Sequence, residues 1–130
     1  MKNFKLDEKL SNAELSFESG DYKAALETLS EVINDSEVSK AMQAQSYFQM
    51  ANIFHMKGEI GKAIKGFNKC LSLEPGHTDA AISLSVVYND IGKYEEARKV
   101  FELANSRVKH GKDTSHFEDD HINKKFALKH

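Results

Sequence analysis

The chain has 130 residues, of which 40% are hydrophobic and 29% are charged, a balance typical of one globular domain. Its formal net charge of −2 argues against a surface that binds the phosphates of a nucleic acid. A single cysteine excludes an internal disulfide and every zinc site built from several cysteines. Because the first ten residues, MKNFKLDEKL, contain no unbroken apolar stretch, we expect no signal peptide, no membrane insertion and a cytoplasmic location.

An internal repeat organises the chain. Gly58 and Gly92 are 34 residues apart, and the residues around them match in size and polarity at the same offset. Gly20 lies 38 residues before Gly58, which marks a further copy with four extra residues around positions 34–38. These extra residues either lengthen a loop at little entropic cost or extend the next helix backward toward Ser39. Three copies of one structural unit are therefore predicted.

Each copy has the periodicity of two helices that meet at its glycine. Apolar residues recur at intervals of three and four, as one face of a helix requires. Their small members would let helices approach closely, and their aromatic members would fill the space beside them. In chain order the positions are Ala13, Tyr22, Ala25, Leu26, Leu29, Val32 and Ile33; then Tyr47, Met50, Ala51, Phe54, Ile60, Ala63, Ile64, Phe67, Cys70 and Leu71; then Ala81, Leu84, Ser85, Tyr88, Tyr94, Ala97, Phe101 and Ala104.

Local signals predict where these helices end and begin. Glycine favours the left-handed residue that ends a helix, so each repeat glycine should end the first helix of its pair. Pro75 and Gly76 should stop the second helix of the second copy, because proline cannot continue a helix. The hydroxyl of Thr78 is then placed to cap the next helix. The predicted fold class is an all-α solenoid of antiparallel helix pairs.

A further helix is predicted over residues 115–128. Its first residues, Ser-His-Phe-Glu from Ser115 to Glu118, have the form of a capping box. Phe117, Ile122 and Phe126 give it an irregular apolar stripe. Because repeat stacks need their last helix covered, we interpret this segment as a capping helix, with a mobile tail or a subunit contact as alternatives.

These residues resemble the tetratricopeptide repeat, whose pattern is W-x₂-L-G-x₂-Y, A-x₃-F and a proline at a period of 34. The second copy has Tyr47, Met50, Ala51 and Phe54 in the first motif, and its second helix continues with Ala63, Phe67 and Pro75. The third copy repeats the pattern, whereas the first departs from it in its opening helix. The resemblance implies a single domain over 1–130, with repeats at about 6–39, 44–77 and 78–111.

In proteins of this kind the first helices of the pairs line a concave groove that binds peptides. The residues one step round each helix from the packing stripe would face this groove. We therefore predict a partner-binding surface whose apolar members could alternatively be core, and whose polar members Asn52, His55 and Asn89 are the stronger candidates. The full set is Leu10, Glu14, Phe17, Phe48, Asn52, His55, Ile82, Val86 and Asn89.

Some family members hold a partner's C-terminal carboxylate with lysines or arginines in the groove. The comparable positions here are neutral or acidic, and an acidic side chain would repel such a ligand. They hold Leu10, Glu14, Gln49, Asp79 and Ser83. An apolar or weakly basic partner segment is the better match.

Residues capable of catalysis or metal binding form no convincing pattern. Four histidines, at positions 110, 116, 121 and 130, lie beside acidic residues, but His116 and His121 would point about 140° apart on a helix. We therefore favour a solvated polar surface over a metal site. Cys70 lies on a packing stripe and is interpreted as a buried thiol and not as a nucleophile. Without a nucleophile, phosphate or dinucleotide motif, we expect no enzyme and no cofactor.

Two functions remain after these exclusions. The favoured one is a non-enzymatic adaptor that binds a peptide or partner protein in the groove. The alternative is a structural protein that assembles with itself through the ends of the repeat stack, because repeat modules expose apolar surface there. The residues expected to mediate such self-association are Val100, Leu103, Phe117, Ile122 and Phe126.

Overall fold

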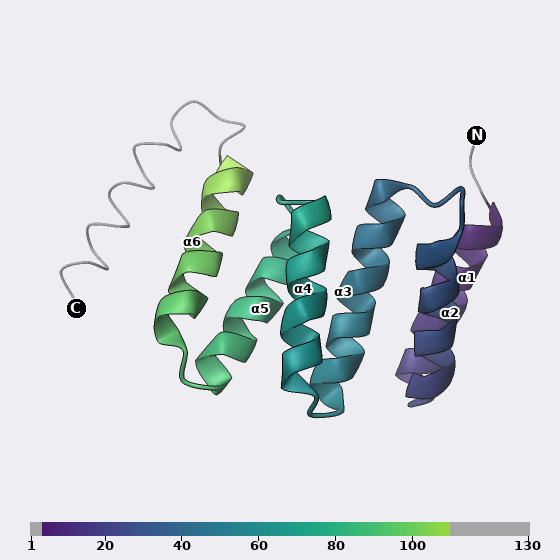
Figure 1. The fold of residues 1–130 in the computed structure, drawn as a ribbon, viewed down its shortest axis with the longest axis horizontal. Coiled ribbons are helices and arrows are strands. Elements are labelled where there is room, and N and C mark those ends of the chain that lie inside the picture. Colours follow the sequence, from purple (N-terminus) through teal and green to yellow (C-terminus); the bar gives the residue numbers. More distant parts are fainter. Residues whose placement is uncertain (1–3, 110–130) are drawn as a thin grey trace. The chain divides into compact units, whose positions relative to one another are not determined.

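The computed structural model describes residues 4–109, which form α-helices joined by short turns (Figure 1). The first unit, Met1–Glu74, holds four of these helices, and the second, Pro75–His130, holds the remaining two. In chain order they are α1 (Phe4–Glu18), α2 (Tyr22–Asn34), α3 (Lys40–Met56), α4 (Ile60–Leu73), α5 (Thr78–Asp90) and α6 (Tyr94–Lys109). The predicted all-α fold of helix pairs is confirmed.

The same turn joins the two helices of every pair. Gly20, Gly58 and Gly92 have φ values of 86°, 81° and 83°, in the left-handed region that glycine adopts without steric cost. The N–H of Gly58 donates to the carbonyl of His55 at 3.0 Å, and the N–H of Glu59 donates to that of Phe54 at 2.8 Å. Both other turns repeat this pair of hydrogen bonds, which is the Schellman motif. The prediction for these glycines is confirmed.

The first residues of the helices agree less well with the predictions from sequence. Asp21 and Ser39 cap α2 and α3 with their side-chain oxygens, and α3 begins at Lys40, so the insertion lengthens that helix backward. Thr78 does not cap α5, contrary to the prediction. The imidazole Nδ1 of His77 instead accepts from the N–H of Ala80 at 3.1 Å. Because the Pro75–Gly76 turn ends one residue earlier than expected, Thr78 is already the first helical residue.

The core of the first unit depends on α3, which packs against both α2 and α4. Ile53 of α3 is buried with Ala13, Ala25 and Leu29 of the first helix pair. The predicted stripe on α3 did not include Ile53, which projects about 200° away from the buried Ala51. A helix with neighbours on two sides buries two faces, and a single stripe describes only one of them.

Small residues bring α3 and α4 close together. Gly66 of α4 is buried, and a Cβ atom added to it would lie 2.8 Å from the Cβ of Ala51 and 3.3 Å from the carbonyl oxygen of Tyr47. Beside this contact the ring of Phe67 is fully buried, with its centroid 6.0 Å from that of Phe48. The predicted combination of close approach and aromatic filling is present in this pair, with Gly66 as its tightest point.

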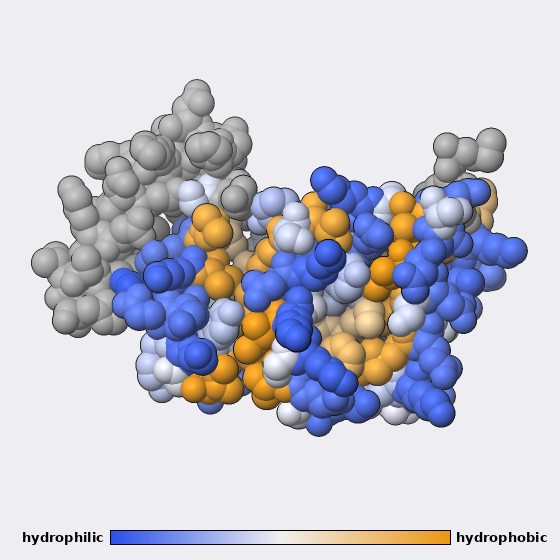
Figure 2. All heavy atoms as spheres, viewed as in Figure 1, coloured by the Kyte–Doolittle hydropathy of each residue, from blue (hydrophilic) through white to orange (hydrophobic). Residues whose placement is uncertain are grey.

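In the second unit α5 packs against α6. Ala80, Ala81, Leu84 and Val87 are buried on α5, whereas α6 buries only Ala97 and Ala104 among its described side chains. Two aromatic residues predicted to pack there are exposed: Phe101 at 48% and Tyr94 at 67%. That prediction was wrong, because the contact with α5 covers a strip of α6 only wide enough for the two alanines. Figure 2 shows hydrophobic residues on the surface among hydrophilic ones.

Candidate functional site

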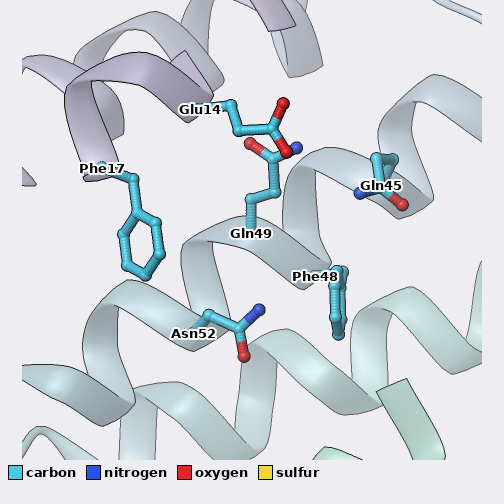
Figure 3. A pocket seen from close by; sticks show the side chains of 6 residues that line it. All are labelled: Glu14, Phe17, Gln45, Phe48, Gln49 and Asn52. Atoms are coloured by element: carbon cyan, nitrogen blue, oxygen red, sulfur yellow. The ribbon is translucent and has the colours of Figure 1, made fainter. Parts of the chain in front are cut away.

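A pocket lies between α1 and α3 in the first unit (Figure 3). Its volume is about 120 Å³. Two side chains come from α1 and four from α3. The lining residues are Glu14 and Phe17, and Gln45, Phe48, Gln49 and Asn52.

Helical periodicity explains why these side chains meet. The four residues of α3 are spaced i, i+3, i+4 and i+7, so they share one face of the helix, and the two residues of α1 are spaced i, i+3. Both aromatic rings are also held from behind. The centroid of Phe17 is 5.7 Å from that of Tyr22, and Phe48 contacts the buried Phe67. The two rings of the pocket are therefore fixed by packing before any ligand binds.

Four of the residues predicted for the groove line this pocket: Glu14, Phe17, Phe48 and Asn52. Leu10 does not line it; it is half-buried and packs against the core of the first unit. Leu10 lies on the same side of α1 as Phe17 but two turns earlier along the helix, away from the pocket lining. His55 is half-buried near the end of α3 and is not part of the pocket lining.

Gln45 and Gln49 line the pocket but were not among the residues predicted for the partner-binding surface. Gln49 was named only as one of the positions where some family members have a lysine or arginine that binds a partner's C-terminal carboxylate. Gln45 lies one turn before Gln49 and precedes Phe48 by three residues. Extending the groove face one turn toward the start of α3 would have included it.

The remaining predicted residues lie in the second unit or beyond the described chain. Ile82, Val86 and Asn89 are all exposed on α5, at spacings that place them on one face. Val100 is half-buried on α6, and Leu103 is 57% exposed. Phe117, Ile122, Phe126 and the predicted helix over 115–128 lie outside the described residues. Binding and self-association through these positions stay predictions.

Cys70 has the environment of a structural thiol. It is fully buried on α4, and this burial, with a smaller contribution from the Glu74 carboxylate, raises its pKa to about 12. Because the thiolate is the nucleophilic form, the folded protein disfavours reaction at this sulfur near neutral pH. Within residues 4–109, no group of three or more histidine, cysteine or acidic side chains is arranged to hold a metal ion. The histidines at 110, 116, 121 and 130 lie outside that range.

Comparison with known proteins places these helix pairs in a family. Residues 44–77 and 78–107 match the sequence model of the tetratricopeptide repeat. The uncharacterized protein MJ0572 of Methanocaldococcus jannaschii is 34% identical over 59 residues, which are 45% of this chain and 69% of that protein. The chain belongs to the tetratricopeptide repeat family.

Solved structures show the same tetratricopeptide-like fold. One crystal structure of MamA superposes with a TM-score of 0.67 at 22% identity, covering 92% of this chain and 61% of MamA. A second gives 0.68 at 24% identity, covering 83% of this chain and 58% of that one. This chain thus spans about three fifths of each MamA chain, and at these identities the likeness is one of fold. Among the described helices, none is long and apolar enough to cross a membrane.

Proposed function

We propose that this tetratricopeptide repeat protein is an adaptor that binds a segment of a partner protein in the pocket between α1 and α3. The family and the fold support a protein–protein interaction module in general. The observation that carries the specific proposal is the pocket itself, which combines two aromatic rings with three side-chain amides. Such a combination suits a peptide, because rings contact a side chain and amides hydrogen-bond to a backbone.

The size of the pocket favours a side chain over a free small molecule. Sites for drug-sized ligands have volumes of roughly 300–1,000 Å³. The pocket here has about 120 Å³, which is enough for an anchoring side chain. The rest of the partner segment would then lie along the surfaces of α1 and α3.

The packing behind the pocket supports binding with little loss of entropy. Phe17 and Phe48 are each in contact with another ring, so few rotamers remain to be lost when a partner binds. Their positions on helices also limit backbone movement. A rigid binding surface of this kind needs no conformational change to work.

Replacing Asn52 with alanine should weaken partner binding by about two- to tenfold, the effect of losing one hydrogen bond. Asn68→Ala is the matched control, because Asn68 is exposed on α4 and does not line the pocket. The two variants and the parent protein would be immobilised, and proteins retained from a lysate of the source cells quantified by mass spectrometry. Both variants should keep the parent melting temperature. If Asn52→Ala retains every captured protein as well as Asn68→Ala does, the proposed site is wrong.

Self-association is a second candidate function, favoured by apolar surface on α6. Leu103 is 57% exposed and lies about 60° round the helix from the half-buried Val100. If copies of the chain associate through this surface, Leu103→Lys should lower the mass measured by light scattering at high concentration. Leu15→Lys, at a comparably exposed leucine of α1, should leave that mass unchanged. A parent protein that stays at 14.6 kDa at every concentration would contradict this candidate.

A further inference from the structure

We propose that the pocket between α1 and α3 accepts a basic side chain of the partner segment, with arginine preferred over lysine. This inference rests on the proposed function and specifies the chemistry of the partner. It is argued from the charges around the pocket and from the groups that line it.

The chemistry of the pocket lining favours a basic side chain over an acidic or an apolar one. Among the six described lining residues, Glu14 alone carries a formal charge, and it is negative. An acidic side chain entering the pocket would meet this carboxylate with no cation in the lining to offset the repulsion. An apolar side chain would fit the rings but would shield the Glu14 carboxylate and the amides of Gln49 and Asn52 from water without replacing their hydrogen bonds to it.

A guanidinium group suits both the charged and the aromatic parts of this lining. It offers five N–H donors for the carboxylate and amide oxygens, and its planar faces stack on aromatic rings. In the view of Figure 3 the rings of Phe17 and Phe48 flank the pocket, with Glu14 and Gln49 at one end and Asn52 at the other. A lysine ammonium would use the same carboxylate but would stack less well, which is the reason for preferring arginine.

The distribution of charge along α1 also favours a basic partner segment. Asp7, Glu14 and Glu18 fall within about 40° of one another around the helix axis, so they form a line of carboxylates that passes the pocket. Lysines of α1 lie on the opposite side, where the ammonium of Lys9 is 3.0 Å from the carboxylate of Glu31. The facing residues of α3 that line the pocket are neutral. A segment with more than one basic residue would therefore be attracted to this surface.

The test uses the 130-residue chain labelled with ¹⁵N and four peptides. The peptides share a capped five-residue alanine backbone and differ only at the central residue, which is arginine, lysine, norleucine or glutamate. Amide chemical shifts are followed during titration of the parent protein, Glu14→Gln and Glu8→Gln. Glu8 is an exposed residue of α1 outside the pocket lining, so its variant has the same change of net charge.

We expect the arginine peptide to bind most tightly, the lysine peptide next and the glutamate peptide least, with shifts at the pocket residues. Glu14→Gln should weaken arginine binding by about two- to fivefold, the effect of one exposed ion pair, and Glu8→Gln should not. Added salt should weaken binding of the arginine peptide to the parent protein, because it screens the attraction between the charges.

Three results would overturn the inference in different ways. If norleucine binds at the pocket as tightly as arginine and Glu14→Gln has no effect, the basic occupant is wrong but the proposed binding site stands. If no peptide shifts the pocket amides and Asn52→Ala also retains all captured proteins, both the occupant and the proposed function are wrong. Equal loss of arginine binding in Glu14→Gln and Glu8→Gln would show that only net charge matters, which also overturns the specific site.

Discussion

Replacing Phe67 with alanine is expected to lower the free energy of unfolding by about 3–5 kcal/mol. The ring is fully buried between α3 and α4, and its contact with Phe48 would be lost with it. The surrounding helices can close the resulting cavity only partly, since the contact at Gly66 and Ala51 already sets how closely they approach. Urea unfolding followed by circular dichroism measures the change.

The repeat supplies a matched control for this substitution. Phe101 occupies the same position in the third copy, 34 residues later, but is 48% exposed on α6. Phe101→Ala should therefore cost about 1 kcal/mol or less. If both substitutions cost the same, burial in this structure does not govern the stability of the two sites. A loss below about 1 kcal/mol for Phe67→Ala would show that the ring is not part of the core.

Two glycine-to-alanine substitutions in α4 should change stability in opposite directions. Alanine is the better helix former by about 1 kcal/mol, so Gly61→Ala should stabilise the protein by up to that amount, because open space surrounds the new methyl group. At Gly66 the same methyl would lie 2.8 Å from the Cβ of Ala51. Separating the helices to make room costs about 1–3 kcal/mol, which outweighs the gain in helix propensity.

Thermal and urea unfolding of the two variants would measure this difference directly. Because both positions lie on the same helix and receive the same substitution, effects on the unfolded chain largely cancel. Gly66→Ala should also loosen the packing of Phe67, since both residues lie at the contact between α3 and α4. An increase in stability for both variants would mean that the helices are less closely packed than described.

Local features of the fold were predictable because they depend on neighbouring residues. Gly20, Gly58 and Gly92 each end the first helix of a pair, because glycine adopts the left-handed backbone conformation without steric cost. Cys70 was predicted to be buried from its place on an apolar stripe, and it is. The capping of α5 was not predicted correctly, because a shift of one residue in a turn transfers the cap from Thr78 to His77.

The candidate site was predicted only in part, because helical periodicity identifies the face of a helix but not its neighbour. Glu14, Phe17, Phe48 and Asn52 were selected because they lie one step round their helices from the packing stripe, a rule that needs only helical periodicity. The rule does not say which two helices come close enough to form a pocket. For the same reason it missed Gln45, which lies one turn before Gln49 on the same face, and included Leu10, which shares the face of Phe17 but lies two turns from the pocket.

The sequence by itself determined the helix pairs and the turns that join them, because these follow from periodicity and local conformational preference. Only the tertiary structure decided which equivalent residues are buried. Phe67 and Phe101 are identical in type and repeat position, yet one is covered by the ring of Phe48 and the other is half exposed. The corresponding residue of α5 is the exposed Ile82. The burial of a side chain depends on which side chains the neighbouring helix presents to it. A repeat pattern specifies only where on its own helix that side chain lies.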